Sequence, residues 1–272
     1  MVALQGKTTV VTGASSGIGK ATACLLAAEG SRVFIAGRST ERLSQVVQLI
    51  EEAGGQASIG AFDLHDYDKL QAFVAEAAEQ TGRLDIIVNA AGVHHPGTIV
   101  DGKLADWRTM FETNVVAVLA GSQAAIRAMR ATGSHGHVVT ISSYAGQGEG
   151  YHVYGATKAA VNSICKVLRA ELEDEPIRAV TIMPGAVATN FGRHYPPEFV
   201  NGMFESVGIS TAFRTGDVLS DEMLEDLKTR ASAVFASPND IARVVLYAVT
   251  QPHDLSVSEI LVGPRKSFPD AA

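Results

Sequence analysis

The chain has 272 residues, of which 46% are hydrophobic and 19% charged, a composition typical of soluble globular enzymes. A formal net charge of −7, without a basic stripe, argues against a nucleic-acid partner. We expect neither a signal peptide nor a membrane span, because no basic arm precedes an apolar run and no apolar run approaches about 18 residues. Cys24 and Cys165 fall in apolar helical patterns, so buried thiols and a cytoplasmic location are expected.

Short apolar strands alternate with helices along the chain. In order, strands are predicted at 8–12, 32–36, 56–62, 85–89, 137–142, 178–183 and 258–264. Helices are predicted at 17–29, 40–53 (capped by Thr40), 66–81, 104–129, around Tyr154, at 217–235 and at 238–250 (capped by Ser237, with Pro238 in the first turn). This alternation predicts one α/β domain over residues 1–272, with a doubly wound parallel sheet of about seven strands covered by helices on both faces.

A glycine-rich turn lies between the first predicted strand and the first predicted helix. Glycines at this place permit a tight turn and a close approach of the backbone to a pyrophosphate, whose charge the helix N-terminus favours. The alternative is a glycine-rich turn without a ligand. The residues predicted to bind a nucleotide here are Gly13, Ser15, Ser16, Gly17, Ile18 and Gly19.

The ends of the next three strands predict the rest of the nucleotide site. Arg38 and Ser39 follow the second strand with no carboxylate beside them, which favours a 2′-phosphate and therefore NADP(H) over NAD(H). A solvated loop arginine is the alternative. After the third strand, Asp63 is placed to accept a hydrogen bond from the adenine amino group, and Leu64 adjoins it. The fourth strand ends, where open α/β sheets bind ligands, in Asn89, Ala90, Ala91 and Gly92.

Tyr154 and Lys158 are four residues apart, so on a helix they lie one above the other. A phenol has a pKa of about 10, and a nearby ammonium lowers it. A serine hydroxyl from Ser142 or Ser143 can donate to an oxygen on which charge develops. These side chains suit proton transfer to or from an alcohol or carbonyl oxygen, while the hydride must come from a cofactor. The alternative is a chance pair of helix-surface neighbours.

Taken together, the motifs resemble those of the short-chain dehydrogenase/reductase family, in family order and over nearly the whole chain. The resemblance implies a compact Rossmann-type fold, with Tyr154 as general acid in reduction and general base in oxidation. It also implies that Ser143 holds the substrate oxygen, and that Lys158 tunes Tyr154 and holds the nicotinamide ribose. Asn114 is implied to bend its helix and to hold a proton-relaying water. The residues implied to hold the nicotinamide are Pro184, Gly185, Val187 and Thr189.

Two positions depart from the family pattern. Ser143 precedes Tyr154 by eleven residues, a couple fewer than is usual in the family, and Ser142 lies closer to the usual separation. Ser143 is still preferred as the catalytic serine, because the strand end fixes the register better than the loop does, and Ser142 is the alternative. Ser16 stands where NADP-dependent members often have a basic residue, so the NADP preference depends on Arg38. The stretch 237–264 resembles the branch with NADP-dependent 3-hydroxy-acid and serine dehydrogenases.

Residues 190–236 are predicted to form an inserted substrate-binding lid at the carboxyl edge of the sheet. Its apolar side chains either line a hydrophobic pocket or pack the lid onto the body. Besides Ser143 and Tyr154, we predict substrate contacts from His95 and His152. No metal site is predicted, because adjacent His94 and His95 diverge and no third ligand is spaced nearby.

The predicted function is an NADP(H)-dependent oxidoreductase that interconverts an alcohol and a ketone or aldehyde, with Tyr154 as general acid/base. The alternatives are a catalytically silent nucleotide-binding regulatory protein, and a dehydratase or epimerase with a retained cofactor. The helices around 104–129 and Tyr154 carry apolar residues on more than one side. A homo-oligomer, dimer or tetramer, is therefore expected, and burial of these helices under later segments is the alternative.

Overall fold

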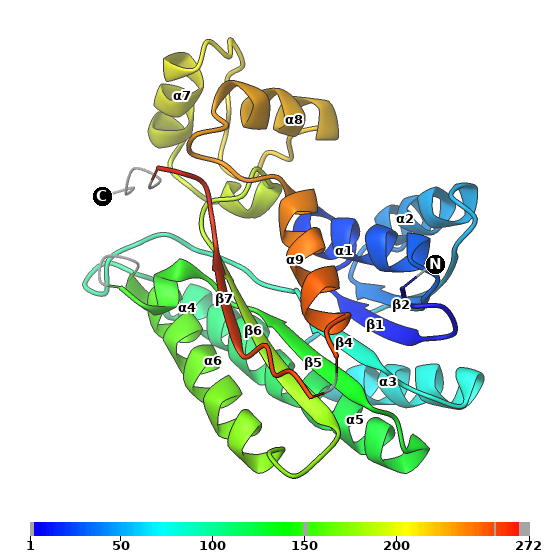
Figure 1. Cartoon of the computed structure of the whole chain (residues 1–272). Helices are drawn as coiled ribbons and strands as arrows, with labels where there is room; N and C mark the ends of the chain where they lie inside the picture. The colour runs from blue at the N-terminus through cyan, green and yellow to red at the C-terminus, as the bar shows by residue number, and fades with distance from the viewer. Residues whose placement is uncertain (1–2, 149–151, 253, 267–272) are drawn as a thin grey trace.

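A seven-stranded, all-parallel sheet forms the centre of the molecule (Figure 1). The computed structural model describes residues 3–148, 152–252 and 254–266. In spatial order the strands are β3 (Gln56–Ala61), β2 (Arg32–Gly37), β1 (Thr8–Thr12), β4 (Ile86–Asn89), β5 (Gly136–Ile141), β6 (Ile177–Pro184) and β7 (Glu259–Val262). This arrangement confirms the predicted single, doubly wound α/β domain.

Helices cover both faces of this sheet. One face carries α1 (Gly17–Ala28), α2 (Thr40–Glu52) and α9 (Pro238–Val249). The other carries α3 (Tyr67–Thr81), α4 (Leu104–Phe111), α5 (Ala117–Thr132) and α6 (His152–Glu171). The central strands β1 and β4 are buried along their whole length, as is expected of parallel strands covered on both sides.

The strand order reverses between β1 and β4, which pair with Thr12 opposite Asn89. The connections that leave these two strands turn toward opposite faces of the sheet. In doubly wound folds the resulting crevice at the carboxyl ends of the strands is where ligands bind. The sheet topology therefore positions the turns after β1 and β4 beside the functional site.

Three helices differ in detail from the prediction. The helix expected over 104–129 is interrupted by a π-helical turn, η1 (Glu112–Val116), before it continues to Thr132. Ser39, and not Thr40, caps α2, because Ser39 has extended backbone and its hydroxyl accepts from the N–H of Arg42 at 3.3 Å. The helix expected over 217–235 is the shorter α8 (Asp221–Arg230), which begins directly after its cap.

Residues 190–236 rise above the carboxyl edge of the sheet as α7 (Pro197–Ser206) and α8, at the top of Figure 1. They begin with a single 3-10 turn, η3 (Asn190–Gly192), after β6. The buried side chains of this segment form a cluster of their own, which includes Val200, Phe204, Phe213, Leu227 and Phe235. The segment thus has a separate small core beside the mouth of the crevice.

Cys24 and Cys165 are both free thiols, the first partly buried and the second buried. Within the described residues, every helix is too short or too polar to cross a lipid bilayer.

Candidate active site

The turn between β1 and α1 packs closely against the turn that follows β4. Gly13 has a φ of +67°, and a Cβ at this position would lie only 2.6 Å from the Cα of Ala91. Glycine is therefore required for both conformation and space. Ser16, the N-cap of α1, has extended backbone and its side chain makes no capping hydrogen bond. The first-turn N–H groups of α1 border the cleft without a side-chain acceptor, so this cradle fits a phosphate group.

The ends of β2 and β3 extend the same cleft, which Arg38, Asp63 and Leu64 line. Arg38 forms no ion pair with any carboxylate of the described residues. Two residues that were predicted to bind the cofactor lie outside the lining. Ser39 instead caps α2, and Asn89 is buried beneath the cleft, where its Nδ2 donates to Ser122 Oγ at 3.0 Å.

Tyr154 and Lys158 lie on one face of α6, and both line the cleft. The Lys158 Nζ donates to the carbonyl oxygen of Ile141 at 3.0 Å and lies 5.8 Å from the centroid of the Tyr154 ring. Burial lowers the pKa of Lys158 from 10.5 to about 8, because an ammonium group is poorly solvated there. At neutral pH the side chain is still mainly a cation, so the phenol of Tyr154 has a positive charge beside it.

Ser142 and Ser143 follow β5 and make different contacts. The hydroxyl of Ser142 is buried and lies 2.6 Å from Asn162 Oδ1, to which it donates. Ser143 is partly exposed in the cleft, and its hydroxyl accepts from the backbone N–H of Ala145 at 3.2 Å. The Ser143 hydroxyl donates to the carbonyl oxygen of Pro184 at 3.5 Å, a much longer bond than the one from Ser142 to Asn162, so an acceptor that enters the cleft can replace this partner more easily.

Asn114 is fully buried in the π-helical turn and holds the turn after β4. Its Oδ1 accepts from the N–H of Val93 at 2.8 Å, and its Nδ2 donates to the carbonyl oxygen of Val93 at 3.0 Å. The same Nδ2 donates to Thr157 Oγ1 at 3.0 Å. These three bonds tie the backbone at Val93 to α6, and so fix the neighbouring His94 relative to Tyr154.

Of the adjacent His94 and His95, His94 faces the cleft, with its ring centroid 4.6 Å from that of Tyr154. Burial, and then the charges of neighbouring histidines, lower the pKa of His94 to about 4, so it is neutral at physiological pH. His95 and His152, the histidines predicted to contact substrate, do not belong to the lining that the described residues form. His95 stacks on His194 with centroids 4.5 Å apart, and His152 is exposed.

The cleft has a volume of about 500 Å³, within the range of about 300 to 1,000 Å³ typical of small-molecule sites. Its outer wall comes from the 190–236 segment and is rich in aromatic side chains, namely Phe191, Tyr195, Phe199, Phe204, Phe213 and Phe235. Phe204 and Phe213 also belong to the separate core of that segment. The segment's apolar side chains therefore line the cleft and also form the core of the segment itself.

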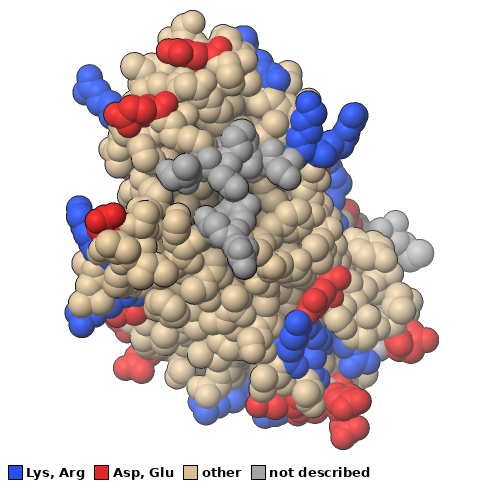
Figure 2. All heavy atoms as spheres, turned by 90° about the vertical axis from the view of Figure 1, so that its left-hand side faces the viewer, with Lys and Arg blue, Asp and Glu red and all other residues tan. Residues whose placement is uncertain are grey.

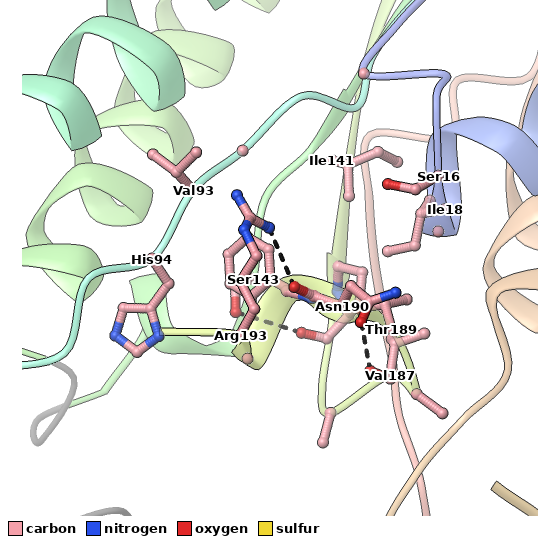
Figure 3. A pocket seen from close by; sticks show the side chains of 18 of the residues that line it. Ser16, Ile18, Val93, His94, Ile141, Ser143, Val187, Thr189, Asn190 and Arg193 are labelled. Carbon is pink, nitrogen blue, oxygen red and sulfur yellow. Dashed lines mark hydrogen bonds between the residues drawn. The ribbon is translucent and has the colours of Figure 1, made fainter. Parts of the chain in front are cut away.

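Arg193, which was not predicted as a site residue, also enters the cleft, as Figure 3 shows. It belongs to an irregular connection, in which no periodicity indicates where a side chain points. Its Nη1 donates to the carbonyl oxygen of Asn190 at 3.1 Å. Within the described residues, no group of three or more His, Cys, Asp or Glu side chains is arranged to hold a metal ion.

Comparison with known proteins identifies the family of this site. The sequence profile described as short chain dehydrogenase matches residues 7–198, more than half of the chain. The chain belongs to this family. As a short-chain dehydrogenase it is an oxidoreductase with a Rossmann-type fold, and the matched region contains the glycine-rich turn, Arg38, Tyr154 and Lys158.

Relatives match this short-chain dehydrogenase over nearly its full length. A protein of Listeria monocytogenes named as an uncharacterized oxidoreductase is 34% identical over 265 residues, which cover 96% of this chain and 97% of that protein. One of Staphylococcus aureus with the same kind of name is 33% identical, over 97% of this chain and all of that protein. The solved structure of a metagenomic short-chain oxidoreductase in complex with NADP has a TM-score of 0.74 and 30% identity, covering 96% of this chain and 98% of that one.

Proposed function

We propose that the protein is an NADP(H)-dependent oxidoreductase that interconverts an alcohol and a ketone or aldehyde. One observation carries the proposal: Tyr154, Lys158 and Ser143 line the same cleft as the glycine-rich turn. A nicotinamide cofactor bound there supplies or accepts the hydride, which none of these side chains can do. The glycine-rich turn with the open first turn of α1 would hold its pyrophosphate, and Pro184, Gly185, Val187 and Thr189 would hold the nicotinamide.

The side chains of this cleft would handle the proton. In reduction Tyr154 donates its phenolic proton to the carbonyl oxygen of the substrate, and in oxidation its phenolate takes the proton from the hydroxyl. Ser143 donates a hydrogen bond to the same oxygen, where charge develops. The ammonium of Lys158 stabilises the phenolate, and the N–H donors that Ile141 does not use are available to the ribose hydroxyls.

The substrate side of the cleft is assigned to His94 in place of His95 and His152. The imidazole of His94 lies against Tyr154 and is neutral, so it presents a hydrogen-bonding edge without a charge. With the aromatic side chains of residues 190–236, it would surround a largely apolar carbonyl compound. We propose that this segment is the lid that covers the bound substrate.

The proposed preference for NADP(H) depends on Arg38. This arginine lines the cleft at the end of β2, where the adenosine ribose binds in Rossmann-type folds, and no described carboxylate neutralises it. An NADP complex of a relative with 30% identity is consistent with this assignment. No cofactor contact is proposed for Ser39 or Asn89, because Ser39 caps α2 and Asn89 is buried in the core beneath the cleft.

A homo-oligomer is part of the proposal. The helices on one face of the sheet leave large apolar side chains exposed, among them Phe111, Val116, Leu119 and Val167. Figure 2 shows a neighbouring side of the molecule, where Lys, Arg, Asp and Glu gather toward the margins. Such apolar surface is typical of subunit contacts, so we expect a dimer or tetramer.

A panel of ketones and aldehydes tests the proposal. Consumption of NADPH, followed by its absorbance, is expected for at least one class of carbonyl compound. Binding of NADPH without turnover across the panel would instead favour a catalytically silent regulatory protein. Conversion of substrate without net consumption of NADPH would favour a dehydratase or epimerase.

A further inference from the structure

Arg193 is a cation of the lid that lies inside the cleft. It follows η3 directly, and its side chain is directed into the pocket in Figure 3 rather than toward solvent. The side chain is partly buried, and one N–H of its guanidinium donates to the carbonyl oxygen of Asn190 at 3.1 Å. A guanidinium has five N–H donors, so most of its hydrogen-bonding capacity is left for another acceptor.

The charge of Arg193 is not balanced by the surrounding residues. Within the described chain it forms no ion pair with a carboxylate. Its pKa is lowered by burial and then by the positive charges of Arg38 and Arg42. Among the described residues, Asp63 is the carboxylate that lines this cleft, and its Oδ1 accepts from the backbone N–H of His65 at 3.0 Å. Arg193 and Arg38 both line the cleft, and two like charges along one cleft favour an anion between them.

We propose that Arg193 binds the 2′-phosphate of NADP(H) together with Arg38, so that the lid itself recognises the cofactor. This inference rests on the proposed function, because it requires a cofactor that carries this phosphate. The pyrophosphate is assigned to the open first turn of α1, whereas Arg38, which lines the same cleft as Arg193, lies at the end of β2. An arginine pair suits a phosphate, since each guanidinium can donate two parallel hydrogen bonds.

Hydrogen bonds join Arg193 and the preceding turn to the rest of the lid. The N–H of Gly216 donates to the carbonyl oxygen of Arg193 at 2.6 Å. The side-chain amide of Asn190 exchanges two hydrogen bonds with the backbone of Leu219, at 2.7 and 2.9 Å. A phosphate held between Arg193 and Arg38 would therefore join the lid to the sheet, and NADP(H) would close the lid more firmly than NAD(H).

Equilibrium binding to Arg193→Gln tests the contact without turnover. The dissociation constant of NADP⁺ should rise about tenfold or more, as for loss of a hydrogen bond to a charged group, while that of NAD⁺ stays unchanged. Arg214→Gln is the matched control, because Arg214 is an exposed arginine of the same lid that does not line the cleft, and both dissociation constants should be unaffected. Unchanged NAD⁺ binding also shows that Arg193→Gln is folded.

Hydrogen exchange in the lid provides a second readout. In the wild-type protein NADP⁺ should slow exchange of the amides of α7 more than NAD⁺ does. In Arg193→Gln the two cofactors should protect α7 equally. A purely structural role of Arg193 would change exchange in the free protein and leave the difference between the cofactors intact.

The outcomes separate this inference from the proposed function. If the wild-type protein prefers NADP⁺ and Arg193→Gln keeps that preference in full, the role of Arg193 is wrong and the proposed function stands. An equal loss of NADP⁺ and NAD⁺ binding would overturn it as well, since the contact would then be to a part that both cofactors share. A wild-type protein that binds both cofactors equally would contradict the inference and the proposed cofactor preference together.

Discussion

The buried ammonium of Lys158 should destabilise the fold, and Lys158→Met should reveal this. Lys158 is 4% exposed, and burial lowers its pKa in the folded protein from 10.5 to about 8. This difference corresponds to about 3 kcal/mol of unfavourable free energy for the charged form. Methionine removes that cost but also the hydrogen bond to the carbonyl of Ile141, which contributes roughly 1 to 2 kcal/mol. The variant should therefore gain about 1 to 2 kcal/mol in free energy of unfolding at pH 7.

The effect of Lys158→Met has a defined pH dependence. Because the folded pKa lies below the unfolded one, the unfolded chain holds this proton between about pH 8 and pH 10.5, whereas the folded chain releases it. The contribution of Lys158 to the free energy of unfolding thus rises with pH across this window. The advantage of the methionine variant should shrink over the same range, while its turnover is lower than that of the wild type by orders of magnitude at every pH.

Urea unfolding followed by the fluorescence of Trp107 measures this difference in the cofactor-free protein. Lys166→Met is the control, because Lys166 is exposed on the same helix and its replacement should not change the pH dependence. A Lys158→Met protein that is less stable than the wild type at pH 7 would refute the reasoning. Such a result would mean that the interactions of the ammonium group in the folded protein contribute more free energy than its burial costs.

Two further predictions concern the cofactor and the serine. Arg38→Asp should shift the ratio of kcat/KM toward NAD(H), because a carboxylate repels the 2′-phosphate and accepts from ribose hydroxyls; equal kcat/KM with both cofactors in the wild type would remove the basis for this claim. Ser143→Ala should lower kcat by about 10²-fold, as for loss of an oxyanion donor. Ser142→Ala should mainly lower the melting temperature, because Ser142 is bonded to Asn162; the opposite pattern would assign the catalytic hydroxyl to Ser142.

The layered fold could be predicted from the sequence because its signals are local and repeated. Apolar runs such as 86–89 are short and fully buried, and each is separated from the next by a helix with an apolar face. That alternation leaves few arrangements other than a parallel sheet covered on both sides. The glycine-rich turn could also be predicted from the sequence. Gly13 has a positive φ and a neighbouring backbone that excludes a Cβ, so the turn requires a glycine at this position.

The parts of the site that were not predicted lie where the chain is irregular. Consecutive loop residues such as His94 and His95 point in different directions, and the bonds from Asn114 to Val93, which hold the adjacent backbone, join residues far apart in the sequence. The position of Arg193 in the cleft could not be predicted, because Arg193 follows a 3-10 turn in an irregular connection that has no periodicity. Thr40 was predicted as the cap of α2 since serine and threonine both suit that role, and a shift of one residue is below what sequence preferences resolve.

We propose that the Tyr154 hydroxyl transfers the proton and that cofactor binding does not depend on this hydroxyl. Tyr154→Phe removes one oxygen atom and keeps the ring that contacts His94. The most direct measurement compares the dissociation constant of NADPH with kcat for the best carbonyl substrate, in the wild type and in Tyr154→Phe. We predict an unchanged dissociation constant and a kcat lower by about 10²- to 10⁴-fold. Near-normal turnover in Tyr154→Phe would contradict the account.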